Sequence, residues 1–164
     1  MNASKAPAVA FAASLAWQLP AVAATTTATF QVQITIQGAC VINSATTLNF
    51  GTQGVLTANT DNTSTITVQC TLSTTYNIGL DAGVGAGATV AARLMTSPAS
   101  NTVTYSLYSD VARTVVWGNT IGTNTVAGVG TGLAVPNIVY GRAPPQTTPP
   151  PALYTDTITV TVTF

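Results

Sequence analysis

Residues 28–36 read ATFQVQITI and alternate apolar and polar side chains over their whole length. A repeat of two residues is typical of a β-strand with one buried face. We therefore predict a strand here, on one edge of a sandwich core. The apolar side chains occupy every even position: Ala28, Phe30, Val32, Ile34 and Ile36.

The chain ends on a second alternating segment, residues 154–164, which read YTDTITVTVTF. Threonines occupy the odd-numbered positions from 157 to 163, and apolar side chains occupy the even-numbered positions between them. Phe164 is in register with the apolar face and is predicted to be the last core residue. Because chain termini generally fray in solvent, such an ending indicates a structural strand that is also a handle for another protein. The residues of this face are Tyr154, Ile158, Val160, Val162 and Phe164.

Further short strands are predicted between these two segments. Residues 83–92 are rich in glycine and alanine and are expected to form a loop. Residues 118–132 are expected to be turns, with at most one short strand near Ile121 or Val126. Pro136 favours an edge or a bulge, because it cannot donate a ladder hydrogen bond. The remaining predicted strands are residues 48–50, 63–70, 76–80, 103–108, 114–117 and 133–140.

About eight to ten short strands with turn signals between them, and no helical period after Ala24, predict an all-β immunoglobulin-like sandwich. Residues 143–151 hold five prolines, which fix φ and remove hydrogen-bond donors. We expect an extended loop there. An SH3-type ligand is disfavoured, because the flanking segments both resemble core strands.

The amino terminus has the pattern of a secretory signal peptide. An apolar run, residues 8–17, follows Lys5 and precedes small residues. The run is too short to span a bilayer, which takes about 20 apolar residues. We predict a signal peptide over residues 1–24, cleaved after Ala23 or Ala24. The alternative is an uncleaved membrane anchor, which the short run and its single flanking charge disfavour. What remains is long enough for one domain.

Charged residues are scarce. The chain has four Lys and Arg, four Asp and Glu, and no His. Removal of Lys5 would leave three Arg against four Asp, a formal charge of −1. Nucleic acid and anionic membrane surfaces are therefore disfavoured as partners, because both are bound through clustered basic residues. Abundant threonine and valine favour strands, and the low charge is associated with an extracellular protein.

Cys40 and Cys70 are the only cysteines. In an exported protein, an even number of cysteines most simply indicates a disulfide. A bond between Cys40 and Cys70 would close a loop of about 31 residues and stabilise the fold by about 3–4 kcal/mol in the chain-entropy treatment. A zinc site is disfavoured, because there is no histidine and two thiolates make only half of a zinc shell. No metal or cofactor is predicted.

No catalytic residues are predicted, and an enzyme is the least favoured class. Asp81, Asp110 and Asp156 lie at turns or strand ends, where aspartate usually bonds its own backbone. Serine and threonine are plentiful, but an activating base is missing once Lys5 is removed. The glycines of residues 83–87 are followed by neither a helix nor a phosphate-binding lysine. Arg142 is expected to pair with a carboxylate or to cap a loop.

Several segments, taken in order, resemble one family, the spore coat protein U domain of Csu-type archaic chaperone-usher pilus subunits. The resemblance runs from about residue 25 to 164. No single motif is specific to this family, but the whole set in this order is strong support for the resemblance. The segments are the alternating residues 28–36, then GAC at 38–40, LNFG at 48–51, VQC at 68–70, YSLY at 105–108, VYGR at 139–142 and the ending at 154–164.

The resemblance implies a pilin-type sandwich that is incomplete and is completed by a donor strand from another chain. It implies a donor strand at residues 25–37 and a sandwich at 38–164. Ala28, Phe30, Val32, Ile34 and Ile36 would then plug a neighbour's groove, and the carboxy-terminal face would contact the chaperone.

The implied function is a structural subunit of a surface fimbria that supports adhesion or biofilm formation. The implied partners are neighbouring pilin subunits in a homo- or hetero-polymer, a periplasmic chaperone and an outer-membrane usher, without stable membrane insertion. Localisation would be extracellular, after export through the periplasm. The alternative is a secreted spore or cyst coat protein, or a surface-binding protein, whose amino-terminal strand folds back to complete its own sandwich.

Overall fold

The computed structural model describes residues 22–164, so the predicted signal peptide at residues 1–24 lies almost entirely outside the described residues. The chain divides into two units, Met1–Ile34 and Thr35–Phe164. Residues 22–39 contain no strand. No helix among the described residues is long and apolar enough to cross a membrane.

Eight strands form the larger unit, which confirms the all-β prediction. Each strand is short, apart from the two that run through the centre of the larger sheet. Their bounds are β1 (Cys40–Ala45), β2 (Thr60–Cys70), β3 (Thr75–Leu80), β4 (Arg93–Thr96), β5 (Thr102–Tyr108), β6 (Val126–Val129), β7 (Ala134–Ala143) and β8 (Val160–Thr163).

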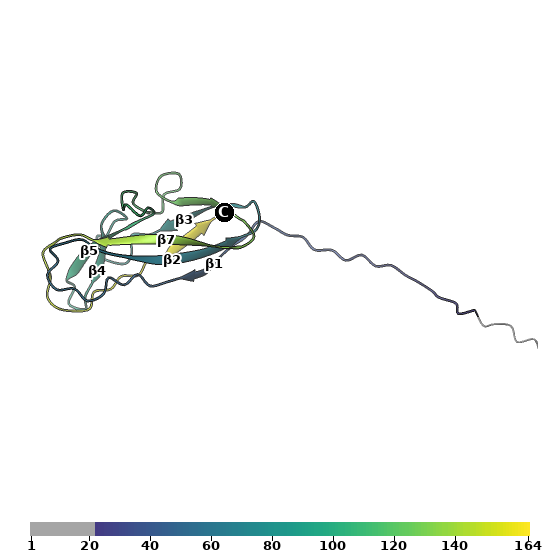
Figure 1. The fold of residues 1–164 in the computed structure, drawn as a ribbon, viewed down its shortest axis with the longest axis horizontal. Helices are drawn as coiled ribbons and strands as arrows, with labels where there is room; N and C mark the ends of the chain where they lie inside the picture. Colours follow the sequence, from purple (N-terminus) through teal and green to yellow (C-terminus); the bar gives the residue numbers. More distant parts are fainter. Residues whose placement is uncertain (1–21) are drawn as a thin grey trace, which may run out of the picture. The chain divides into compact units, whose positions relative to one another are not determined.

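The strands form two antiparallel sheets, in the orders β1-β2-β7-β5-β4 and β6-β3-β8. Strands β2 and β7 pair without interruption from Thr60↔Ala143 to Gln69↔Ala134. Figure 1 shows β1, β2 and β7 side by side, and β8 as the yellow strand that ends at the C mark. This is the arrangement of an immunoglobulin-like sandwich.

Pro136 lies within β7, opposite Thr67 of β2. On its other side β7 pairs with β5 only from Tyr140 to Arg142. At Pro136 the strand therefore has one neighbour, and this edge-like position is one that proline tolerates. The predicted edge position is confirmed locally, although β7 is a central strand farther along.

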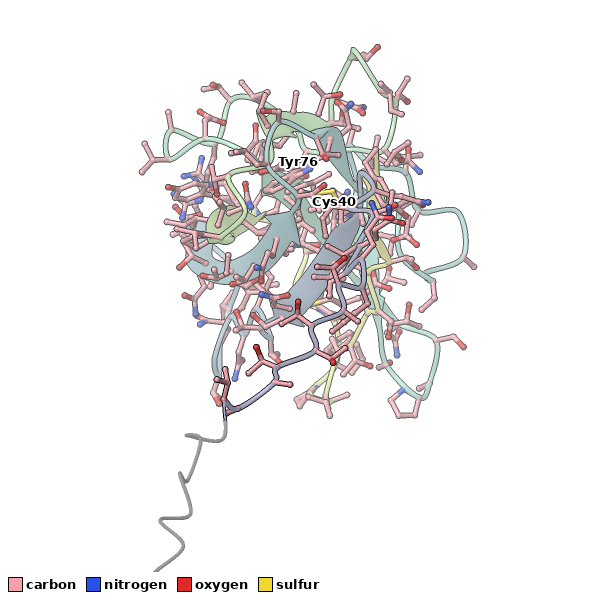
Figure 2. The ribbon with its side chains drawn as sticks, turned by 90° about the vertical axis from the view of Figure 1, so that its right-hand side faces the viewer. Cys40 and Tyr76 are labelled. Carbon is pink, nitrogen blue, oxygen red and sulfur yellow. A yellow bond between two sulfur atoms is a disulfide. The ribbon has the colours of Figure 1, made fainter. Side chains whose placement is uncertain are left out.

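The hydrophobic core lies between the two sheets and draws on both. Trp117 anchors it, because its side chain is buried and its indole N–H donates to the carbonyl oxygen of Ile78 at 2.8 Å. Tyr76 belongs to this core, and Cys40 packs against it; both are marked in Figure 2. The buried set is Ile66, Val68, Cys70, Tyr76, Ile78, Leu80, Tyr105, Leu107, Trp117, Val139 and Ala143.

Arg93, at the start of β4, is a fully buried cation with 0% exposure. Burial lowers its pKa from the ordinary value. The guanidinium donates to four carbonyl oxygens, which compensate for the lost hydration. These acceptors belong to Leu80 at 3.2 Å, Asp81 at 2.8 Å, Val90 at 2.8 Å and Trp117 at 2.7 Å.

Two predicted strands are wrong in the larger unit. Residues 48–50 form no strand; they belong to an irregular segment in which the amide of Gly51 donates to Asn49 Oδ1. Residues 114–117 contribute only an isolated bridge between Val116 and Tyr108. Both segments lack a neighbouring strand along their length, so their apolar side chains pack without a ladder.

The carboxy-terminal prediction is confirmed only in part. The strand covers Val160–Thr163 rather than residues 154–164, because its partner β3 pairs with it only from Asn77 to Leu80. Phe164 is 61% exposed, so the prediction that it is the last core residue is wrong for this chain by itself. Residues 28–36 pair with no strand in the single chain, so their pairing with a neighbouring subunit stays a prediction.

Candidate functional site

A long apolar groove opens onto the core of the larger unit, with a volume of about 1130 Å³. One wall is residues 45–56 and the other is residues 148–160. We call this the open groove. The side chains of its floor also belong to the buried core. Among them are Ile66, Leu80, Tyr105, Leu107, Val139 and Ala143.

The carboxy-terminal wall presents an unpaired strand edge. Strand β8 pairs with β3 on one side, and no other strand within residues 22–164 pairs with it. An edge of this kind offers main-chain donors and acceptors to a further strand. Together with the apolar floor, it makes the groove a site for an extended segment with one apolar face.

Alternation along this wall follows the sequence prediction closely. Ile158, Val160 and Val162 pack against the core, and the first two also line the groove. The threonines at 157, 159, 161 and 163 are exposed. Tyr154 is half-buried at the start of the wall, and its hydroxyl donates to the carbonyl oxygen of Pro150 at 2.7 Å. Of the five predicted side chains, only Phe164 lies outside the groove and the core.

Two aspartates attach this wall to the rest of the sandwich. Asp156 accepts hydrogen bonds from the Tyr105 hydroxyl at 2.7 Å and from the Val84 amide at 2.8 Å. Asp81 accepts from the amides of Thr159 at 2.9 Å and Gly83 at 3.0 Å. Partial burial acts to raise the pKa of Asp81, but the hydrogen bonds from Thr159 and Gly83 outweigh it, so the net pKa is lowered.

The proline-rich segment closes one end of the groove by joining its two walls. The Leu56 amide donates to Thr148 Oγ1 at 2.8 Å, and the Gln146 amide donates to the Leu56 carbonyl oxygen at 3.0 Å. The Gln146 side chain also exchanges two hydrogen bonds with the backbone of Thr104. Residues 143–151 are thus the predicted loop, with a structural role in the wall.

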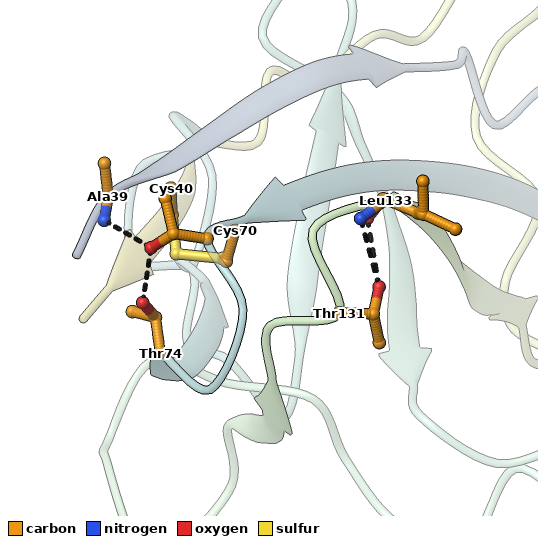
Figure 3. The surroundings of a disulfide bond; sticks show 7 residues. Ala39, Cys40, Cys70, Thr74, Thr131 and Leu133 are labelled. Atoms are coloured by element: carbon orange, nitrogen blue, oxygen red, sulfur yellow. Dashed lines mark hydrogen bonds between the residues drawn. A yellow bond between two sulfur atoms is a disulfide. The ribbon is translucent and has the colours of Figure 1, made fainter. Parts of the chain in front are cut away.

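The disulfide lies at the start of β1 and confirms the predicted pairing of Cys40 with Cys70 (Figure 3). The two residues are directly opposite each other in the β1–β2 ladder, with 4.1 Å between their Cα atoms. Close by, the Ala39 amide donates to Thr71 Oγ1 at 3.0 Å, and that hydroxyl also contacts Thr74 Oγ1 at 2.6 Å. The first residue of β1 is therefore fixed both to β2 and to the turn that follows β2.

The amino-terminal segment itself carries a row of exposed apolar side chains. Phe30, Val32 and Ile34 are 87%, 82% and 85% exposed, and Ile36 is 72% exposed. Ala28 is exposed as well. A regular apolar row in solvent is uncommon in a finished protein and indicates a surface that binds a partner.

Most charged side chains of residues 22–164 pair with one another or with backbone groups. Arg142 contacts both carboxylate oxygens of Asp61 at 2.8 Å, as the sequence allowed, and Arg113 lies 3.4 Å from the same carboxylate. Asp110 accepts from the amides of Thr114 and Val115, in the turn role predicted for it. Within residues 22–164, no group of three potential metal ligands is present. These contacts stabilise loops and strand ends.

Comparisons with known proteins agree with this architecture. The sequence profile of the Spore Coat Protein U domain matches residues 26–161. The chain is 41% identical over 180 aligned positions to "Protein U" of Myxococcus xanthus, with the full length of both chains covered.

A solved structure with a similar fold is that of the CsuC–CsuE complex of a chaperone and a tip adhesion subunit, before assembly, from the archaic chaperone-usher Csu pili of Acinetobacter baumannii. The TM-score is 0.56 at 20% identity, over 79% of this chain and 40% of that chain. At this identity the likeness concerns the fold, which supports the pilin type of sandwich. From the profile match and the full-length relative, the chain belongs to the Spore Coat Protein U domain family.

Proposed function

We propose that this protein is a structural subunit of an extracellular fibre, assembled by the chaperone-usher pathway through donor-strand exchange. In this proposal residues 28–36 of one copy fill the open groove of the next. The observation that carries the proposal is the complementarity of two surfaces in one chain. Residues 28–36 carry a row of exposed apolar side chains. The groove is apolar and is bordered by the unpaired edge of β8, so it could accept one more strand.

The chemistry of the two surfaces matches. The donor segment would pair its main chain with the free edge of β8 and direct its even-numbered side chains to the groove floor. Burying Phe30, Val32, Ile34 and Ile36 would contribute roughly 1.5–3 kcal/mol each in gross transfer free energy. A slip of one residue would turn all four to solvent, so the apolar pattern also fixes the register.

An apolar groove with a free strand edge is open to wrong partners and needs protection before assembly. A periplasmic chaperone that lends a strand to β8, and an outer-membrane usher at which the next subunit replaces it, would supply that protection. The fold shared with a subunit solved in a chaperone complex supports this route. Export through a signal peptide at residues 1–24 and oxidation of Cys40 and Cys70 fit a periplasmic stage. Adhesion or biofilm formation would then be the role of the fibre.

The sharpest test compares an even-numbered, apolar position of residues 28–36 with the odd-numbered, polar position beside it. In the mature chain, Ile34→Asp places a carboxylate on the apolar row, whereas Gln33→Asp places the same charge one residue away on the polar row. We expect wild type and Gln33→Asp to form ladders on unboiled denaturing gels and Ile34→Asp to remain monomeric. The Ile34→Asp chain should still bind a synthetic peptide of residues 25–37, because its groove is intact.

Equal behaviour of the two aspartate variants would contradict the proposal, since donor-strand insertion requires the difference in parity. Monomeric wild type that also fails to bind the peptide would contradict it independently. The second result would favour a monomeric coat protein instead.

A second candidate function is a coat protein, and the name of the family is the observation that favours it. In such a coat protein the amino-terminal strand would complete its own sandwich, and the protein would be monomeric. A monomer that loses its fold when residues 25–37 are deleted would support it.

A further inference from the structure

Tyr105 touches both walls of the open groove from its floor. It lies on β5, and its side chain is buried. Its ring meets the ring of Phe50, in the first wall, edge to face, with centroids 6.1 Å apart and planes inclined by 66°. Its hydroxyl donates to Asp156 Oδ2, in the second wall, at 2.7 Å. One side chain therefore connects the two walls.

Asp156 transmits this contact to the backbone of the second wall. Its other carboxylate oxygen accepts from the Val84 amide at 2.8 Å. Gly83 makes that approach possible, since its φ is +82° and a Cβ added there would collide with the Asp156 carboxylate. Only glycine combines this conformation with the close contact. The wall is thereby held between β5 and the loop that follows β3.

The wall has little else to define its position. β8 begins only at Val160. Before it, the ladder is a single bridge, in which Thr96 and Thr155 exchange main-chain hydrogen bonds of 2.8 and 3.2 Å. The amide of Thr159 donates to Asp81 Oδ1 at 2.9 Å, and the carbonyl oxygen of Thr159 accepts from the Asp81 amide at 3.2 Å. Residues 152–159 are thus held by a few main-chain hydrogen bonds, by packing of Ile158 against the core, and by the side-chain contacts of Asp156.

We propose that Tyr105 and Asp156 are positioning residues, a clasp that sets the separation of the two groove walls and so the readiness of the groove to accept a strand. This inference rests on the proposed function. Binding to a site that is correctly shaped for only a fraction of the time is weakened by that fraction. Preorganisation of the walls removes this loss.

The clasp is suited to work throughout the ordinary pH range. Burial and the hydrogen bond to Asp156 both raise the pKa of Tyr105 far above its usual value, so the hydroxyl keeps its proton and donates. The positive charge of Arg93 acts in the opposite direction on that pKa, and the negative charge of Asp81 acts in the same direction as Asp156.

The test uses the mature chain carrying Ile34→Asp as the monomeric parent and a labelled peptide of residues 25–37 as the probe. Tyr105→Phe removes the clasp hydroxyl. Tyr140→Phe is the matched control, because it removes a hydroxyl from a strand residue that does not line the groove. Loss of a charge-assisted hydrogen bond should lower the association constant roughly three- to tenfold for Tyr105→Phe, with no change for Tyr140→Phe.

Two more variants separate positioning from general stability. Gly83→Ala keeps both the Tyr105 hydroxyl and the Asp156 carboxylate, but its Cβ would push Asp156 out of position. It should therefore weaken peptide binding in the same way. Asp156→Asn keeps an acceptor oxygen and should recover part of the binding lost in Asp156→Ala. Amide hydrogen exchange should rise at Val84 and Thr159 in the weakened variants while β2 and β7 stay protected.

Variants that unfold more easily but bind the peptide with unchanged rate and affinity would overturn the clasp and leave the proposed function standing. A parent that binds no peptide at all would overturn both. Weaker binding by Tyr140→Phe equal to that of Tyr105→Phe would also overturn the clasp, because the effect would not be specific to the groove.

Discussion

Replacing Arg93 by Met should destabilise the fold strongly, although it removes a buried charge. The guanidinium satisfies four carbonyl oxygens, and those of Leu80 and Trp117 are bound at a fully buried site. Methionine fills similar space but donates nothing, so these acceptors would be left without partners. Each buried acceptor left without a partner costs about 1–3 kcal/mol, so the loss would be a large part of the roughly 5–15 kcal/mol that stabilises a typical domain.

The assay is urea unfolding of the disulfide-bonded mature chain at neutral pH, followed by tryptophan fluorescence, since Trp117 packs in the same region. Arg142→Met is the matched control. Its ion pair with Asp61 is partly exposed, and pairs of that kind contribute about 0–1 kcal/mol. Arg93→Lys should fall between the two, because an ammonium keeps the charge but donates from one nitrogen. A loss below about 1 kcal/mol for Arg93→Met would refute the reasoning, because unsatisfied buried acceptors cost more than that.

Three further predictions concern the fold. Replacing both Cys40 and Cys70 by Ala should lower the free energy of unfolding by about 3–4 kcal/mol, and an unchanged unfolding midpoint would contradict the loop-closure argument. The pKa of Asp61 is lowered from its ordinary value of 3.8, and the hydrogen bond from Arg142 is the largest cause. The ionised Asp61 therefore stabilises the fold fully above pH 3.8, and this stabilisation is lost as the pH falls through the lowered pKa. The difference in unfolding midpoint between wild type and Asp61→Asn should therefore shrink from pH 6 toward pH 2, and a difference that grows would show the wrong sign. Gly128→Ala should cost about 1–3 kcal/mol, because its Cβ would collide with the Tyr76 ring, whereas Gly54→Ala, with open space around it, should be nearly neutral in the same melts.

The strands that the sequence predicted correctly carry their pattern locally. In β5 and in the second half of β2 buried residues alternate with partly exposed ones, and in β3 the predicted face of Tyr76, Ile78 and Leu80 is buried. The predicted ranges differ from the observed bounds by at most a few residues. β1 was missed because its sequence, CVINSA, has no clear alternation. It is a strand because it pairs with β2 in the register fixed by Cys40 and Cys70, and that pairing is not local.

β4 was missed for a related reason. Its first residue, Arg93, is charged, and charge normally indicates a surface position. The carbonyl oxygens that make its burial possible come from residues 80, 81, 90 and 117, so no local pattern could reveal it. The glycine-rich residues before it were correctly predicted to be a loop without a strand.

The open groove could be anticipated only through the family resemblance. A groove is a missing strand, and the two walls that define it, residues 45–56 and 148–160, are far apart in sequence. The apolar face at 158, 160 and 162 was visible as alternation. The contact of Tyr105 with Asp156 was not, because a tyrosine in a strand and an aspartate near a strand end carry no signal of each other. Phe164 shares the parity but lies beyond the last paired residue, so parity alone misplaced it.

The most direct test of the central claim is a cysteine cross-link in the mature chain carrying Val32→Cys and Val160→Cys, analysed on non-reducing denaturing gels. Val160 lines the open groove, whereas Thr161 beside it is exposed, so Val32→Cys with Thr161→Cys is the control pair. Donor-strand assembly predicts a ladder of covalent multimers for the first pair, abolished by reductant, and none for the control. A cross-linked monomer would contradict it, because residues 28–36 would then complete the sandwich of their own chain.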